Sequence, residues 1–390
     1  MALAAAGFVI AKEKGPYGTE AVLVLEDGSF FKGWGFGSPG LRVGEVVFNT
    51  GMVGYPEALT DPSYRGQILC LTYPLVGNYG VPSYEDVDEY GLPIHFESTK
   101  IQVAGLVVHE LCLKPYHWSM KKTLHDWLAE EGVPGIAGVD TRRLTKRLRE
   151  RGVMMGALHV AEEASVEEAF RALERAPRYD EVSYVEEVTI KKPELLGLGR
   201  VRVALIDCGV KAGILRELLA RGVSVVRLPF NASADEVLSY DPSGVLISNG
   251  PGDPMKCEAA IRTSRHLFEA GVPLFGICLG NQILSLALGG RTYKLKYGHR
   301  GQNKPCIDLD TGLCYVTSQN HGYAVDPSSL DGTGLRVWFI NADDKTVEGV
   351  KHESKPCLAV QFHPEARPGP YDTGWVFDLF LKVMEAGRHA

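Results

Sequence analysis

The spacing of apolar residues divides the chain into two parts with different periodicities. In the first part, glycine, proline and asparagine separate short apolar runs, which predict strands at 21–25, 30–34, 44–48, 67–72 and 103–108. The Asp27-Gly28 pair between the first two runs is typical of a β-hairpin turn. Helical periodicity is confined to 117–128 and 141–150. We therefore expect a β-rich α+β domain over residues 20–160.

Strands and helices alternate from residue 200 onward. Apolar runs predict strands at 201–206, 223–228, 244–248, 273–277, 335–340 and 358–362. Helical patterns lie between or after them, at about 214–219, 256–269 and 371–385. This alternation predicts a doubly wound, mostly parallel sheet over residues 200–390, with function at the carboxyl ends of its strands. The expected fold class of the whole chain is α/β.

Two further segments complete the expected organisation. Residues 161–199 hold an acidic amphipathic helix followed by a polar stretch, and we expect the interdomain connector there. Residues 1–19 are expected to form an N-terminal extension of unknown role. Their apolar run has no basic segment before it and no convincing cleavage site after it, which argues against a signal peptide.

Composition and charge exclude several classes of function. The 390 residues carry a net charge of -7, which argues against nucleic-acid binding as the main activity. No window is apolar for long enough to span a membrane. The eight cysteines are scattered without a C-x-x-C pair, so we expect neither a disulfide framework nor a metal site. This cysteine usage favours a reducing, cytoplasmic location.

Candidate chemistry begins at Gly276-Ile-Cys278-Leu-Gly280, between a predicted strand and a predicted helix. The pattern is that of a nucleophile elbow with cysteine in place of serine. Glycine on either side would relieve crowding in the sharp turn. The thiol would then lie at a helix N-terminus, where the partial positive charge favours a thiolate. A buried structural cysteine in a βα turn is the alternative, and this motif alone does not decide between the two.

Two other strand ends supply possible partners for the thiol. His363-Pro364-Glu365 follows an apolar strand, and Glu365 is well placed to orient the imidazole of His363. A surface histidine in a proline-bounded turn is the ordinary alternative. The second candidate is the loop Ser248-Asn-Gly-Pro-Gly-Asp-Pro254. Such a loop is usually only a turn, but at this sheet edge it could direct N–H groups at an oxyanion.

Taken together, these three motifs resemble a class I (triad-type) glutamine amidotransferase domain. Motifs of the first part resemble the amino-terminal domain of the carbamoyl-phosphate synthetase small subunit: Gly44-Glu-Val-Val-Phe-Asn-Thr50, Gly54-Tyr-Pro-Glu-Ala-Leu-Thr-Asp-Pro-Ser-Tyr64, Thr72-Tyr-Pro-Leu-Val-Gly-Asn-Tyr79 and Gly138-Val-Asp-Thr-Arg142. The resemblance extends over nearly the whole chain from about residue 20.

The resemblance implies a role for each matching residue. Cys278 would be the nucleophile that attacks glutamine, His363 the base and acid, and Glu365 the group that holds the ring. Backbone N–H groups of Leu279 and Gly250 would form the oxyanion hole. The residues that match the family's glutamine-binding positions are Ser63, Gly250, Gly252, Leu279, Gln282, Asn320, Gly322 and Tyr323. Because Ser63 belongs to the first domain, the site should lie between the domains.

The resemblance also implies a partner. A separate large synthetase subunit would receive ammonia through a tunnel and use bicarbonate and two ATP to make carbamoyl phosphate for pyrimidine and arginine synthesis. We expect no cofactor in this chain, with ATP and magnesium used by the partner. Nothing after the terminal helix could encode the synthetase, so we expect it on another chain. A glutaminase for a different synthetase, or an inactive regulatory subunit of the same fold, is the alternative.

One position departs from the family pattern. The family usually has histidine after the second glycine of the elbow, and here the residue is Asn281. We expect the chemistry to survive because the catalytic histidine is assigned to His363. Asn281 is expected to alter either the hydrogen bonds of the elbow or the coupling to the partner. Lys211, Cys208 and His321 are expected to have structural roles, His321 in positioning the loop that carries Asn320.

Overall fold

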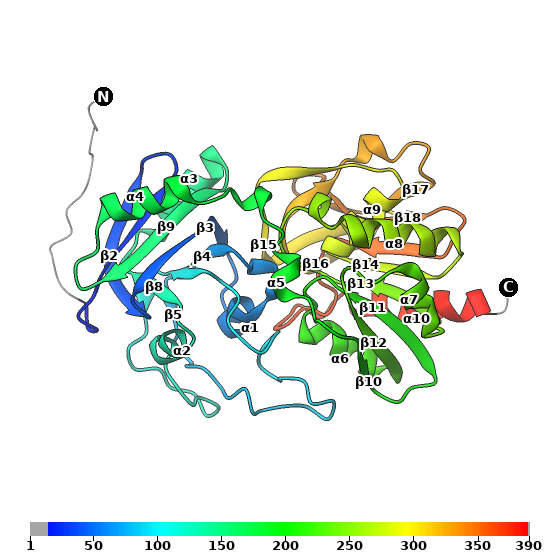
Figure 1. Ribbon diagram of the computed structural model, residues 1–390, viewed down its shortest axis with the longest axis horizontal. Coiled ribbons are helices and arrows are strands. Elements are labelled where there is room, and N and C mark those ends of the chain that lie inside the picture. Colours follow the sequence, from blue (N-terminus) through cyan, green and yellow to red (C-terminus); the bar gives the residue numbers. More distant parts are fainter. Residues whose placement is uncertain (1–14, 389–390) are drawn as a thin grey trace.

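The computed structural model describes residues 15–388, and residues 1–14 of the predicted N-terminal extension lie outside this range. Figure 1 shows a β-barrel domain at one end of the molecule and a domain built on a large sheet at the other. The barrel closes in the order β1-β2-β8-β6-β4-β3-β9. Its strands are β1 (Glu20–Leu25), β2 (Phe30–Gly37), β3 (Gly40–Asn49), β4 (Gln67–Leu71), β6 (Gly105–Val107), β8 (Pro134–Ala137) and β9 (Met154–Ala161).

Short helices cover the barrel. They are α1 (Tyr55–Thr60), α2 (Leu124–Glu130), α3 (Thr141–Arg151) and α4 (Val166–Arg175), with a 3-10 turn at Pro62–Tyr64 and a small separate sheet of β5 (Leu75–Val76) and β7 (Glu110–Leu111). Successive residues of a strand enter different cores: Val46 packs with Leu144 and Leu148 of α3, whereas Val47 packs with Trp127 of α2. Successive side chains of a strand point to opposite faces, and because both Val46 and Val47 are apolar, both faces of the barrel wall are buried in apolar cores.

The sequence predictions for the first domain are confirmed in kind, with two differences. The hairpin turns at Gly28, which has a φ of 83°. The helix predicted at 117–128 is wrong in its start, because Thr123 and Asp126 form a capping box that begins α2 at Leu124. The preceding Lys122 instead forms a β-bridge to Val81. The pairs β3–β4, β4–β6 and β6–β8 are parallel, which the short apolar runs did not reveal.

The second domain is a sheet in the order β10-β12-β11-β13-β14-β19-β18-β17-β15-β16. Its strands are β10 (Glu194–Leu196), β11 (Val201–Asp207), β12 (Val223–Pro229), β13 (Gly244–Ile247), β14 (Leu274–Ile277), β15 (Thr292–Asp308), β16 (Cys314–Val325), β17 (Leu335–Asn341), β18 (Val347–His352) and β19 (Cys357–Val360). The neighbouring strands β12, β11, β13, β14 and β19 are parallel to one another, as predicted. Antiparallel strands extend the sheet on both sides.

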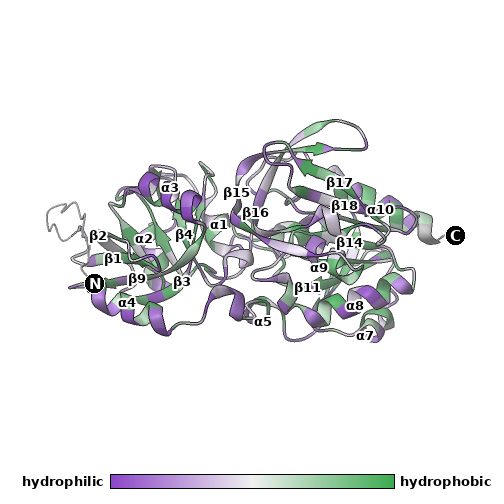
Figure 2. Ribbon diagram, turned by 90° about the horizontal axis from the view of Figure 1, so that it is seen from above, coloured by the Kyte–Doolittle hydropathy of each residue, from purple (hydrophilic) through white to green (hydrophobic). Residues whose placement is uncertain are grey.

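Helices cover both faces of this sheet, which makes it doubly wound. They are α6 (Ala212–Ala220), α7 (Ala234–Ser239), α8 (Glu258–Glu269), α9 (Leu279–Ala287) and α10 (Trp375–Arg388), with single 3-10 turns at Pro254–Lys256 and Pro327–Ser329. One core holds Leu267 of α8 and Ile283 of α9, and the other holds Leu215 of α6 and Phe377 of α10. In Figure 2 the central strands, such as β11 and β14, are largely green, which agrees with burial on both faces, whereas β15 and β16 are largely purple and white.

The segment predicted as the connector, 161–199, contacts both domains. Helix α4 packs against β1 and β9 through Ala169 and neighbouring apolar residues, and β10 pairs with β12 at the far edge of the second sheet. Between them lie a 3-10 turn at Tyr179–Glu181 and the short helix α5 (Val185–Val188). The ion pair Arg65–Glu187, at 2.7 Å, ties this segment to the first domain.

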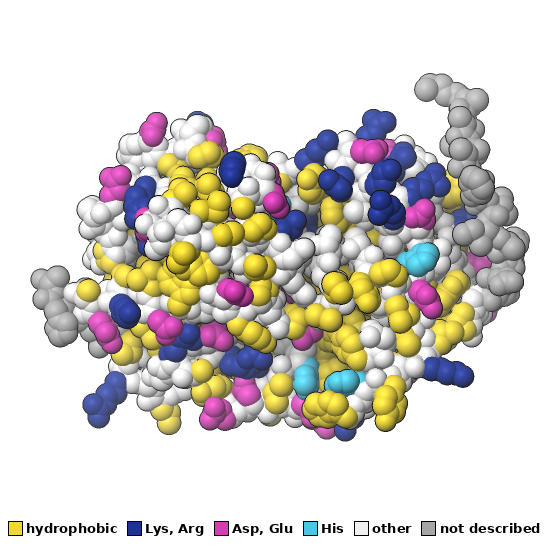
Figure 3. All heavy atoms as spheres, turned by 180° about the vertical axis from the view of Figure 1, so that it is seen from behind, with side chains coloured by type: hydrophobic (Ala, Val, Ile, Leu, Met, Phe, Trp, Pro, Cys, Tyr) yellow, Lys and Arg dark blue, Asp and Glu magenta, His cyan; other side chains and the backbone are white. Residues whose placement is uncertain are grey.

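The surface of the first domain is uneven in character. Lys and Arg side chains gather at its upper edge in Figure 3, over the position of α3, whose Arg142, Arg143 and Lys146 are exposed. Elsewhere on this domain, Met52 and Val53 are 67% and 55% exposed. Within residues 15–388, no helix is long and apolar enough to cross a membrane.

Candidate active site

Cys278 lies at the sharp turn between β14 and α9, as the elbow motif predicts. Its φ of 55° and ψ of -103° are strained for a residue with a side chain. A Cβ atom on Gly276 would lie 2.5 Å from the backbone oxygen of Gly280, and one on Gly280 would lie 2.1 Å from that of Ile247. The two glycines are therefore needed for the close approach of α9 to β13 and β14.

The thiol of Cys278 is 2% exposed and lies against β16. Its Sγ donates a hydrogen bond to the backbone oxygen of Asn320, at 3.6 Å. The imidazole of His363 lies beyond β19, and its Nε2 has no hydrogen-bond partner among the described residues. Burial acts to lower the pKa of His363, but Glu365 and, more weakly, Cys278 raise it above its usual value.

His363 is oriented by Glu365. Its Nδ1 lies 2.7 Å from Oε1 of the carboxylate, and both side chains are buried. Burial acts to raise the pKa of Glu365, but Lys211 and His363 hold it well below its usual range. The carboxylate is therefore ionised at neutral pH, which fixes the Nδ1–H tautomer and leaves Nε2 toward the thiol.

Lys211, which was expected to have a structural role, reaches this carboxylate. Its Nζ donates to Oε1 of Glu365 at 2.9 Å and lies 3.8 Å from Oε1 of Glu97. Glu97 belongs to the first domain and also accepts a hydrogen bond from the N–H of Gly213 at 2.9 Å. Burial acts to lower the pKa of Lys211, but the two carboxylates raise it, so the buried ammonium stays charged. No sequence motif indicated this contact, because Glu97 is far from the other two residues in the chain.

The loop that follows β13 lies beside the thiol. A Cβ atom on Gly250 would lie 2.1 Å from the backbone oxygen of Cys208, so glycine is required there. Gly252 has a φ of 89°. Gly250, Gly252 and Leu279 line the same cavity as Cys278. The loop and the elbow therefore border the cavity beside the thiol, the location that the predicted oxyanion hole requires.

A turn of the first domain enters the site. Asn249 Nδ2 donates to Ser63 Oγ at 2.9 Å, and Asn320 Nδ2 donates to Asp61 Oδ2 at 2.9 Å. Asp61 also accepts from the backbone N–H of Ser63 at 2.8 Å, which holds the turn. All four side chains are buried. Polar contacts across the domain boundary therefore place Ser63 in the site.

The remaining predicted binding residues close the cavity. Gln282 Nε2 donates to the backbone oxygen of Tyr323 at 2.9 Å and to Gln361 Oε1 at 3.2 Å. Asn320, Gly322 and Tyr323, on β16, line the cavity opposite the elbow. The cavity has a volume of about 390 Å³, including space open to solvent. The structure thus brings Cys278 and all eight predicted binding residues to one cavity, with His363 and Glu365 behind the thiol.

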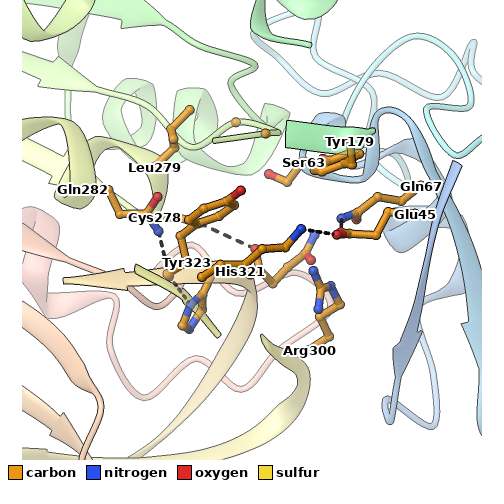
Figure 4. A pocket seen from close by; sticks show the side chains of 15 residues that line it. Glu45, Ser63, Gln67, Tyr179, Cys278, Leu279, Gln282, Arg300, His321 and Tyr323 are labelled. Atoms are coloured by element: carbon orange, nitrogen blue, oxygen red, sulfur yellow. Dashed lines mark hydrogen bonds and ion pairs between the residues drawn. The ribbon is translucent and has the colours of Figure 1, made fainter. Parts of the chain in front are cut away.

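The cavity wall contains further residues that the motifs did not identify. They are Glu45, Gln67, Tyr179, Lys294, Arg300 and His321. Figure 4 shows Ser63, Tyr179, Gln67 and Glu45 on the side of the first domain, opposite Leu279, Cys278 and Gln282. Glu45 Oε1 pairs with Lys294 Nζ at 2.6 Å and bridges the two domains. Glu45 lies within a family motif, but its spacing gave no sign that it would line the cavity.

Comparisons with known proteins assign the chain to a family. Residues 23–158 match the family model described as the carbamoyl-phosphate synthase small chain, CPSase domain, and residues 204–383 match the glutamine amidotransferase class-I model. A carbamoyl phosphate synthase small chain from Pyrococcus furiosus is 52% identical, over 94% of this chain and 98% of its own length. The small chain from Methanopyrus kandleri is 50% identical, over 93% and 98%.

The chain belongs to the carbamoyl-phosphate synthase small-chain family. A third relative, the small chain from Sulfolobus acidocaldarius, is 49% identical over 94% of this chain and 97% of its own length. The matches span both domains, so the family resemblance inferred from the motifs and the α/β fold class are confirmed.

Within this family member, Asn281 occupies a fully buried position on α9. Its Nδ2 donates to Gln361 Oε1 at 3.0 Å, the same oxygen that accepts from Gln282. Asn281 therefore touches the residue that supports a predicted glutamine ligand, and it does not face the thiol. Its predicted influence on the hydrogen bonds of the elbow has a defined route, through Gln361.

Proposed function

We propose that this chain is the glutaminase subunit of a carbamoyl-phosphate synthetase, which hydrolyses L-glutamine and delivers ammonia to a separate synthetase subunit. One observation carries the proposal. A cysteine at a strained elbow faces a cavity built by both domains, and a histidine oriented by a buried carboxylate lies behind it. The membership of both domains in the small-chain family selects this activity over that of other glutaminases.

The first chemical step would form a thioester. His363 Nε2 takes the proton of the Cys278 thiol, and Sγ attacks the side-chain carbonyl carbon of glutamine. The resulting oxyanion is stabilised by the N–H groups of Leu279 and Gly250, an arrangement typically worth about 3 kcal/mol in the barrier. The tetrahedral intermediate collapses, the C–N bond breaks, and His363 returns its proton to the leaving nitrogen, giving ammonia and a γ-glutamyl thioester.

The second step would regenerate the thiol. Water attacks the thioester carbonyl while His363 removes its proton, the C–S bond breaks, and Cys278 regains a proton as glutamate forms. Glu365 holds the ring and stabilises the imidazolium in both steps. The α-amino and α-carboxylate groups of glutamine would contact Ser63, Gly252, Gln282, Asn320, Gly322 and Tyr323, which surround the rest of the cavity.

A second cavity behind Asn320 offers a route for ammonia. It has a volume of about 380 Å³, including space open to solvent, and is lined by residues that include Asp61, Asn320 and His363. It shares Asn49, Gly54, Ala58 and Gln302 with a neighbouring cavity beside the exposed residues Met52 and Val53. We infer that ammonia leaves the thiol along this side, and that the synthetase subunit covers the apolar exit. Transfer within the assembly would keep ammonia unprotonated and therefore nucleophilic.

The partner completes the reaction. The large subunit would combine the ammonia with bicarbonate and two ATP to form carbamoyl phosphate for pyrimidine and arginine synthesis. ATP and magnesium would bind the partner, and we propose no cofactor for catalysis in this chain. A cytoplasmic location is proposed because all eight cysteines are free, including the reactive Cys278.

The decisive experiment separates the two nitrogen sources in the complex reconstituted with the large subunit. Replacing Cys278 with serine should abolish carbamoyl phosphate synthesis from glutamine and leave synthesis from added ammonia unchanged. Synthesis from glutamine that persists in Cys278→Ser would overturn the assignment of the nucleophile. Glutamine hydrolysis that supports only a different ATP-dependent synthetase would favour the alternative partner, and no hydrolysis in the wild-type complex would favour an inactive subunit.

The ammonia route makes a separate prediction at Ala58, which borders both cavities behind the thiol. Ala58→Phe should fill the passage between them. We expect glutamine hydrolysis to continue while the carbamoyl phosphate formed per glutamine falls severalfold, with synthesis from added ammonia retained. Ala58→Ser, which keeps the passage open, is the matched control. Equal coupling in the two variants would contradict this route.

A further inference from the structure

A cluster of two histidines and a glutamate lies behind the glutamine cavity, outside the catalytic groups described above. His299 on β15, His321 on β16 and Glu348 on β18 are all buried, with exposed fractions of 6%, 4% and 0%. One side-chain donor atom from each lies within 4.8 Å of the others. No sequence motif could reveal this set, because its members come from three different strands.

The distances within the cluster suit a small cation. His299 Nδ1 lies 3.2 Å from Glu348 Oε1, and His321 Nε2 lies 3.8 Å from the same oxygen. Ligand atoms about 2.0–2.1 Å from a tetrahedral zinc ion are separated by roughly 3.3 Å. The three atoms therefore need only small adjustments to become ligands of one ion.

The outer nitrogen of each histidine is already held by an acceptor. His299 Nε2 lies 2.8 Å from Asp344 Oδ2, and His321 Nδ1 lies 2.9 Å from the backbone oxygen of Tyr323. Metal-binding histidines almost always donate their second ring N–H to a carboxylate or a backbone carbonyl in this way. Both rings thus present their remaining nitrogen to Glu348.

The atoms that face one another around His321 include no hydrogen-bond donor. Because Nδ1 of His321 donates to Tyr323, its Nε2 carries a lone pair. That nitrogen faces Glu348 Oε1 and also Gln319 Oε1, at 3.4 Å. The amide nitrogen of Gln319 is directed elsewhere, to Cys306 and Thr317. Three acceptors therefore converge, and a positive charge between them would satisfy all three.

Glu348 supplies a second, independent indication. Its side chain is fully buried, Oε1 accepts from Asn341 Nδ2 at 3.3 Å, and Oε2 has no hydrogen-bond partner among the described residues. A buried carboxylate oxygen without a donor is costly unless a cation neutralises it. A dication would balance the charges of Glu348 and Asp344 with both histidines neutral.

We propose that His299, His321 and Glu348 bind a divalent first-row metal ion in a structural site that fixes β15 and β16. The chemistry of these ligands favours zinc. Two imidazoles and one carboxylate suit zinc, and Gln319 or water would supply the fourth ligand. His321 also lines the glutamine cavity, which gives the ion a path to the site. Because Asn320 and Gly322 flank His321, the ion would hold the strand that carries predicted glutamine ligands.

The test measures metal content and ligand geometry directly. The full chain carrying Cys278→Ser, so that the nucleophilic thiol does not bind metal, is freed of metal with a chelator and titrated with zinc and with cobalt. We expect about one ion per chain, a cobalt spectrum of tetrahedral type without thiolate charge transfer, and a Tm that rises with zinc. Glu348→Gln should weaken binding about tenfold or more.

Glu353→Gln, an exposed change near the same strand, is the matched control and should bind as the parent does. If Glu348→Gln does not fold, His299→Gln provides the second test of the same ligand set. Binding that is equal in the parent and in either ligand variant would overturn the site. The absence of stoichiometric binding in the parent would also overturn the site. It would mean that a proton on His321, and not a metal ion, lies between the three acceptors.

Discussion

The protonation state of His363 depends on neighbours with opposite effects. Burial and the ammonium of Lys211 lower its pKa, whereas Glu365, at 2.7 Å, raises it by stabilising the imidazolium. The resulting pKa of His363 lies above the usual value for histidine. The histidine can therefore hold the proton of the thiol while the sulfur attacks, and release it to the leaving nitrogen.

A first prediction follows for Glu365→Gln. Removing the carboxylate charge removes the main influence that raises the pKa of His363, so that pKa should fall. Since the base must be unprotonated to accept the proton of the thiol, the acidic limb of kcat/KM for glutamine should move to lower pH, by about one to three units. The measurement is a pH profile of glutaminase activity in the complex. Glu353→Gln should leave the limb in place, and a shift to higher pH would contradict the electrostatic role of Glu365.

A second prediction concerns Asn281, which is fully buried and bonded to Gln361. The larger imidazole of Asn281→His should displace Gln361 and, through it, Gln282. We expect KM for glutamine to rise a few-fold, corresponding to a loss of about 1 kcal/mol in binding, with ammonia-dependent synthesis unchanged. Asn231→His, at an exposed position, is the control. If KM and activation by the partner both stayed at wild-type values, Asn281 would have no such role.

At the scale of elements, the turn between β14 and α9 is packed so closely that added side-chain atoms cannot be accommodated at its glycines. Strand β14 lies between parallel strands, and α9 begins immediately after Cys278. The helix can follow the strand so closely only because Gly276 and Gly280 have no Cβ atoms. The strained backbone of Cys278 is maintained by this packing, which holds the thiol above the sheet edge.

The third prediction addresses this packing. In Gly280→Ala the new Cβ atom would lie 2.1 Å from the backbone oxygen of Ile247, which cannot move without disturbing β13. We expect the free energy of unfolding to fall by about 1–3 kcal/mol and glutaminase activity to fall with it. Gly374→Ala, where the nearest atom would lie 3.8 Å away, should change neither quantity. Chemical denaturation together with activity measures both, and wild-type behaviour of Gly280→Ala would refute the packing argument.

Elements with strong local signals could be predicted from the sequence. The hairpin at Gly28, the elbow and the helix α3 all have turn residues or periodic apolar residues that act over a few positions. The start of α2 was wrong because a capping box and the bridge from Lys122 to Val81 overrode the apolar period. The long strands β15 and β16 gave no clear alternation, since many of their buried side chains are polar.

The residues of the candidate site also differ in whether a local motif identifies them. Cys278, His363 and Glu365 were identified from motifs, and the structure brings them together, although their catalytic roles stay predictions. Lys211 and Glu97 were not identified, because a buried charge pair across two domains leaves no local pattern. The cluster around Glu348 leaves no local pattern for the same reason, and no metal site is predicted from the sequence.

At the scale of the whole molecule, buried charges join the two domains. Lys211 lies between Glu365 of the second domain and Glu97 of the first, and all three side chains are at most 6% exposed. The backbone N–H of Ala212 also donates to the backbone oxygen of Glu97, at 2.9 Å. Lys211 thus neutralises Glu365 within the second domain, and Glu97 of the first domain adds a second carboxylate to the same ammonium when the domains are docked.

The fourth prediction tests this contact. Lys211→Met would leave two buried carboxylates without their cation, and we expect the free energy of unfolding to fall by about 3–5 kcal/mol. Adding Glu97→Gln should recover part of the loss, because one of the two charges is then removed. Lys192→Met, at an exposed position, is the control. Additive losses in the double variant, measured by denaturant unfolding, would show that Lys211 and Glu97 are not coupled.

The turn that carries Ser63 has a thermodynamic consequence. Asp61 and Ser63 belong to the barrel domain but are bonded to Asn320 and Asn249 of the other domain, at the wall of the glutamine cavity. A ligand in this cavity would therefore lie against residues whose hydrogen bonds join the two domains. We predict that a partner favouring one arrangement of the domains would change the affinity for glutamine, and that glutamine would change the affinity for that partner by the same factor.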